Sequence, residues 1–67
     1  MSEHIYEVKK LEGSSTTGTD DAIKNAIAKA AADNADIRWF EVVETRGHVE
    51  NGAVAHWQVT VNIGCRA

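Results

Sequence analysis

Cysteine is nearly absent from this chain of 67 residues, and this limits how the chain can be stabilised. Cys65 is the only cysteine, so no disulfide can form within the chain. The three histidines are scattered, and together with one cysteine they do not make the ligand cluster of a structural zinc site. A chain this short buries only about 60% of its unfolded surface. We therefore expect self-association to supply the missing stability.

Long apolar runs and an excess of positive charge are also lacking. No apolar run approaches the roughly 18 residues of a transmembrane helix. A net charge of −3 and a pI near 5.4 argue against nucleic-acid binding, which depends on clustered Lys and Arg. The amino terminus lacks the pattern of a secretory signal, so the expected location is cytoplasmic. A hydrophobic fraction of 43% is typical of a folded protein, here one domain over residues 1–67.

The sequence predicts one helix and three strands. Residues 4–12 alternate imperfectly and predict a first strand, and residues 13–19 form a loop rich in Gly, Ser and Thr. Residues 20–33 predict a helix, capped at Gly18 or Thr19. Its apolar residues recur at helical spacing: Ile23, Ala26, Ile27, Ala30 and Ala31. Residues 34–36 connect this helix to a second strand, residues 37–49, and a third strand follows at residues 53–63.

Asn51-Gly52 predicts a tight hairpin turn between the second and third strands. With a two-residue turn, odd residues of the second strand share a face with even residues of the third. This face would carry Trp39, Glu41, Val43 and Thr45 beside His56, Gln58, Thr60 and Asn62. The opposite face would carry Phe40, Val42, Trp57, Val59 and Val61 beneath the helix. A β-bulge would break this parity.

The order strand, helix, strand, strand predicts an α+β fold, a βαββ unit. The simplest topology is a three-stranded antiparallel sheet of order 1-3-2, with the helix packed on one face. The face with Trp39 and Gln58 is then uncovered by the chain itself.

Trp39 is the leading candidate for a functional residue, and two interpretations are open. It could stack on a planar ring, or it could pack in an interface between subunits. Gln58 could offer a donor and an acceptor to the edge of that ring, or it could simply be solvated. Arg46 and Arg66 could each meet a phosphate or pair with a surface carboxylate. Parity places Arg46 on the face opposite Trp39.

No catalytic or metal-binding arrangement is predicted. Cys65 has no histidine nearby in the sequence, and parity places His48 and His56 on opposite faces. Glu41 and Glu44 are likewise predicted on opposite faces, which argues against a pair of catalytic carboxylates. The chain is therefore not expected to be an enzyme.

The sequence resembles the dodecins, a family of flavin-binding proteins with a βαββ subunit assembled as a hollow dodecamer. The resemblance covers essentially the whole chain. The residues that carry it are Gly13-Ser14-Ser15, Asp21-Ala22-Ile23, Ala26-Ile27, Ala30, Trp39-Phe40-Glu41-Val42-Val43-Glu44-Thr45-Arg46-Gly47 and Val54-Ala55-His56-Trp57-Gln58-Val59.

The resemblance implies a role for each candidate residue. Trp39 would stack on the isoalloxazine ring of a flavin, and Gln58 would bond its pyrimidine edge. Arg46 and Arg66 would lie near flavin phosphates or coenzyme A, although Cys65 replaces the usual aromatic residue before Arg66.

The implied function is storage and sequestration of a flavin, with its photochemistry limited by stacking. FMN is the expected ligand, and riboflavin, FAD and lumichrome are further candidates. The alternatives are a coenzyme A-binding protein, an enzyme that uses bound flavin, and a purely structural oligomer.

Overall fold

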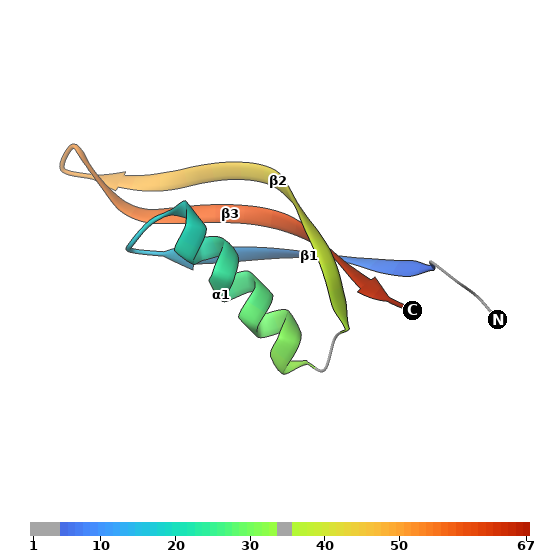
Figure 1. Ribbon diagram of the computed structural model, residues 1–67. Helices are drawn as coiled ribbons and strands as arrows, with labels where there is room; N and C mark the ends of the chain where they lie inside the picture. Colours follow the sequence, from blue (N-terminus) through green and yellow to red (C-terminus); the bar gives the residue numbers. More distant parts are fainter. Residues whose placement is uncertain (1–4, 34–35) are drawn as a thin grey trace.

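The computed structural model describes residues 5–33 and 36–67, which form one helix and three strands (Figure 1). The elements are β1 (Tyr6–Ser15), α1 (Thr19–Ala32), β2 (Ile37–Glu50) and β3 (Ala53–Arg66). β3 lies between β1 and β2 and is antiparallel to both. This confirms the predicted βαββ fold and strand order. The predictions for His4, Asn34 and Ala35 lie outside the described residues.

β1 and β3 are longer than the sequence predicted. β1 continues through Gly13 and Ser15, which pair with Val59 and Trp57 of β3. The predicted loop is therefore shorter, because backbone pairing across the sheet outweighs the local turn preference of small polar residues. The Ser15 hydroxyl accepts a bond from the Thr17 amide (2.8 Å) and donates one to Asp21 in the first turn of α1 (2.7 Å). The strand thus leads almost directly into the helix.

The core lies between α1 and β3. It consists of Ala22, Ala26, Ala30, Val59, Val61, Ile63 and Cys65. The helix approaches the sheet closely at Gly13, where a Cβ would collide with the carbonyl oxygen of Ala22. Small residues on both elements therefore set the spacing between helix and sheet. We call the sheet face that α1 covers the inner face and the opposite one the outer face.

α1 covers β1 and β3 better than it covers β2. Ile23 and Ile27, two residues of the predicted apolar stripe, are only partly buried against the core. Phe40 and Val42 lie on the inner face, since they pair with the buried Ile63 and Val61, but they are 49% and 44% exposed. The inner surface of β2 therefore remains open along one side of the helix.

The hairpin turn forms as predicted. Asn51 and Gly52 have φ angles of 53° and 78°, the left-handed conformation that a tight turn between two strands requires. Next to the turn, Glu50 pairs with Ala53 as the parity argument expects.

Three β-bulges interrupt the predicted parity along the hairpin: two in its middle, and a third at Arg38, beyond which Ile37 pairs with Cys65. Between the pairs Val49–Val54 and His48–His56, β3 contains one extra residue, Ala55. Between Glu44–Thr60 and Val42–Val61, β2 contains one extra residue, Val43. The β2 residues between the bulges at Ala55 and Val43, residues 44–48, lie on the face opposite to the predicted one, because one extra residue inverts the alternation of faces.

Because of these bulges, several residues lie on a different face of the sheet from the predicted one. Arg46 pairs with Gln58 and lies on the outer face with Trp39, whereas Thr45 pairs with Val59 and belongs to the inner face. Glu41 and Glu44, predicted on opposite faces, both lie on the outer face. His48 and His56, also predicted on opposite faces, share the outer face too, and their ring centroids are 6.3 Å apart.

Among the residues that the structure describes, no helix has the length and apolarity that a membrane crossing requires.

Candidate functional site

Trp39 lies over a glycine on the outer face. It pairs with Gly64 of β3, and a Cβ at Gly64 would collide with the Cε2, Cζ2 and Nε1 atoms of the indole. The Tyr6 ring of β1 meets the indole edge-to-face, with ring centroids 6.4 Å apart and an interplanar angle of 67°. Gly64 thus supports the indole from below and Tyr6 flanks it. The Trp39 side chain remains 38% exposed and presents a flat apolar surface to solvent.

Gln58 lies beside Arg46 on the same face. The Nε of Arg46 donates to the Oε1 of Gln58 at 3.1 Å, and its Nη2 lies 4.0 Å from the Oε2 of Glu12 on β1. The arginine therefore reaches across β3, and its guanidinium contacts one residue of β3 and one of β1.

Arg66 stands near the other end of the outer face. It pairs with Tyr6 and follows Gly64 by two residues, so it shares the face of the Trp39 indole. Its backbone amide donates to the carbonyl oxygen of Asp36 at 2.9 Å, which fixes the end of β3 beside the start of β2.

The four predicted site residues form two groups in one chain. Trp39 with Arg66 lies at one end of the outer face, and Gln58 with Arg46 lies towards the other. Gln58 precedes Gly64 by six residues, which corresponds to about 20 Å along a strand. A fused three-ring system stacked on Trp39 is too short to reach Gln58 of the same chain.

Sequence reasoning missed three residues of this face: Tyr6, Glu12 and Gly64. An isolated glycine in a strand often marks a close approach of another group, so Gly64 carried a usable signal. That signal was lost because the third strand was predicted to end at Ile63. The positions of Tyr6 and Glu12 follow only from the pairing of β1 with β3, which the sequence pattern did not reveal.

The outer face offers groups for binding. Glu41 accepts a hydrogen bond from the side-chain amide of Asn62 at 3.3 Å, and Cys65 is buried in the core. Within residues 5–33 and 36–67, no group of three histidine, cysteine or acidic side chains is arranged to hold a metal ion. A flat aromatic surface, a side-chain amide and two cations can recognise a planar ligand that carries a polar edge and a phosphate.

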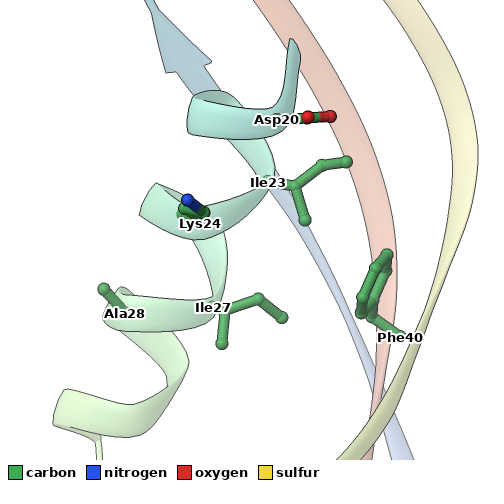
Figure 2. A pocket seen from close by; sticks show the side chains of 6 residues that line it. All are labelled: Asp20, Ile23, Lys24, Ile27, Ala28 and Phe40. Atoms are coloured by element: carbon green, nitrogen blue, oxygen red, sulfur yellow. The ribbon is translucent and has the colours of Figure 1, made fainter.

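A separate groove opens on the inner face between α1 and β2 (Figure 2). Its volume is about 460 Å³, and Asp20, Ile23, Lys24, Ile27, Ala28 and Phe40 line it. Figure 2 shows the Phe40 ring of β2 across the groove from the two isoleucines of the helix. The groove is mainly apolar and lies on the face opposite Trp39.

The fold and the outer face together define a small α+β protein whose βαββ chain presents an aromatic and polar sheet surface. The dodecin family model matches residues 5–67, and the chain belongs to the dodecin family. It is 36% identical over 62 residues to the dodecin of Thermus thermophilus, an alignment that covers 92% of this chain and 90% of that protein.

Two solved dodecin structures are similar to this chain along nearly their full length. The dodecin from Streptomyces davaonensis is 45% identical with a TM-score of 0.91, and the match covers 98% of this chain and 97% of that one. The dodecin from Streptomyces coelicolor is 43% identical with a TM-score of 0.92, and the match covers 100% and 96%.

Proposed function

We propose that the protein is a flavin-binding storage protein and not an enzyme. It stacks FMN or a related flavin at the subunit interfaces of a hollow dodecamer and so limits the photochemistry of the flavin. The observation that carries this proposal is the indole of Trp39, which is supported by Gly64 and left open on the outer face. Such a surface suits a flat heteroaromatic ring.

The separation of Trp39 from Gln58 supports a site shared between subunits. In one chain the two residues are about 20 Å apart along β3, which is too far for both to contact the same ring. Gln58 of a second copy can supply the amide for the pyrimidine edge. The ligand site and the subunit interface are then the same place.

Arg46 and Arg66 supply the phosphate contacts in this proposal. FMN is the first candidate because it combines a planar ring with one phosphate, and FAD, riboflavin and lumichrome are further candidates. Solved structures of Thermus thermophilus dodecin include variants in which one tryptophan and two arginines are replaced. Those three positions have the same spacing as Trp39, Arg46 and Arg66.

Replacing the indole tests the stacking. Stacking of a flat heteroaromatic ring on an aromatic side chain contributes about 1–3 kcal/mol, so we expect Trp39→Ala to weaken flavin binding by about 10- to 100-fold. Titration of flavin with protein, followed by quenching of flavin fluorescence, measures this. Trp57→Phe is the control, because Trp57 pairs with Gly47 on the inner face. Unquenched flavin with the unmodified protein, or equal quenching by Trp39→Ala, would refute the proposal.

The inner-face groove supports the self-association. Phe40 is half exposed beside Ile23 and Ile27, and a second copy that covers the groove would bury this apolar surface. We expect Phe40→Asp to dissociate the assembly, because it places a charge in an apolar interface. Light scattering coupled to gel filtration measures the mass. Val49→Asp is the matched control, since Val49 is 61% exposed and lies beside the hairpin turn. An intact Phe40→Asp oligomer contradicts a role for the groove.

Coenzyme A binding is the second candidate function, and the observation that favours it is the pair of arginines on the outer face. Denaturing the purified protein and identifying the released small molecules by mass spectrometry separates the two. Release of a flavin supports the first proposal, release of coenzyme A alone supports the second, and release of neither favours a purely structural oligomer.

A further inference from the structure

Arg46 contacts two side chains of its own chain, one on each of the other two strands. It pairs with Gln58 of β3. Glu12 of β1 lies on the same face and pairs with Thr60, which follows Gln58 by two residues in β3. The Nε of Arg46 donates to Gln58 Oε1 at 3.1 Å, and Nη2 lies 4.0 Å from Glu12 Oε2. Arginine has only donors, so it contacts the carbonyl oxygen of Gln58 and leaves the amide nitrogen to donate to a ligand.

A phosphate that binds Arg46 has to compete with Glu12. Phosphate and carboxylate both use the planar donors of the guanidinium. Glu44 faces Thr60 from the β2 side, but in the described part of the chain it is Glu12 that forms an ion pair with Arg46.

We propose that Glu12 is a specificity-determining residue of the flavin site. By holding the guanidinium of Arg46 beside Gln58, it lowers the preference for phosphorylated over unphosphorylated flavin. This inference rests on the proposed flavin-binding function and on the phosphate contact of Arg46. It assigns to Arg46 a second role as a positioning residue that orients the amide of Gln58.

The test compares FMN with riboflavin, which differ only by the phosphate. We expect Glu12→Gln to raise the ratio of FMN affinity to riboflavin affinity by about three- to fivefold, the range of an exposed ion pair. Riboflavin affinity itself should change by less than about twofold, which also shows that the variant is folded. Isothermal calorimetry or fluorescence quenching gives both dissociation constants.

The matched control is Glu7→Gln. Glu7 lies on the same strand and its replacement makes the same change in net charge, but it pairs with Cys65 and so belongs to the inner face. Its affinity ratio should equal that of the unmodified protein. An equal rise in both variants would mean that net charge alone acts, and it would overturn the role of Glu12.

A double-mutant cycle with Arg46→Gln separates holding of the arginine from direct repulsion of the phosphate. Without Arg46, Glu12→Gln should leave the affinity ratio unchanged. A gain that persists in the Arg46→Gln background would show that Glu12 acts on the phosphate directly, and it would overturn the inference.

The outcomes also separate this inference from the function on which it rests. If riboflavin and FMN both bind and Glu12→Gln leaves their ratio unchanged, the inference fails and the proposed function stands. If neither flavin binds the unmodified protein, the proposed function fails and the inference fails with it.

Discussion

Gly64→Val abolishes saturable quenching of flavin fluorescence, a larger loss than that expected for Trp39→Ala. A Cβ at position 64 collides with the indole ring, so the branched side chain of valine has to displace Trp39. Trp39→Ala removes the stacking surface and leaves its space empty. Gly64→Val removes the same surface and also moves the indole into the volume that the flavin would occupy. The expected affinity loss exceeds about 100-fold, the upper end of the stacking contribution.

Thr60→Val is the matched control for this prediction. It places the same side chain on the same strand and on the same face, four residues from Gly64 and opposite Glu44 rather than Trp39. We expect its flavin affinity to stay close to that of the unmodified protein. Circular dichroism of both variants at one protein concentration shows whether the fold is retained. A folded Gly64→Val variant that still quenches flavin would mean that the indole is not the stacking surface.

Gly13→Ala strongly destabilises the fold. The added methyl group collides with the backbone carbonyl oxygen of Ala22 and comes close to the side chain of Ala26. A carbonyl inside a helix cannot rotate away, so the helix has to move off the sheet and the alanine core loosens. We expect the free energy of unfolding to fall by at least about 2 kcal/mol. This is a large fraction of the total for a chain of this size, which is only about 3–10 kcal/mol. The melting temperature should fall by about 10–20 °C.

Gly18→Ala makes the same chemical change where there is space. A Cβ at Gly18 has no heavy atom within 4 Å, and its φ of 169° is an extended conformation open to any residue. The loss should stay below about 1 kcal/mol, the usual range for an N-cap position. Thermal unfolding of both variants at one protein concentration measures the difference, because self-association makes the melting temperature depend on concentration. Equal melting temperatures would contradict the close approach at Gly13.

The sequence was sufficient to predict the elements, their order and the face of Trp39. These follow from strong local signals: an alanine-rich helix, an Asn-Gly turn, and the alternation of Val59, Val61 and Ile63 in β3. The position of Arg46 could not be predicted, because a single extra residue in a strand leaves no mark in composition or alternation. The contact of Arg46 with Glu12 was also beyond prediction, since it depends on the register of two strands that are distant in the sequence.

The separation of Trp39 from Gln58 has the same origin. The alternation of the strands assigns both residues to one face, and the structure confirms this. Alternation alone, however, does not give the distance between two residues along the strand. Only the pairing of Trp39 with Gly64 shows that one chain cannot bring the two side chains to one ring. Whether two copies do so is the question that the flavin titrations and the mass measurements answer together.

Two of the three bulges, one in each strand of the hairpin, compensate for each other. The extra residue Ala55 in β3 inverts the alternation of faces, and the extra residue Val43 in β2 inverts it again. The five β2 residues from 44 to 48 therefore lie on the faces opposite to those that the turn alone would give them. Residues 39–42 and 49–50 of β2 keep the alternation set by the turn, so Phe40 lies on the helix side while Arg46 lies on the side of Gln58. One continuous strand can therefore contribute apolar side chains to an interface on one face and a cation to a ligand on the other.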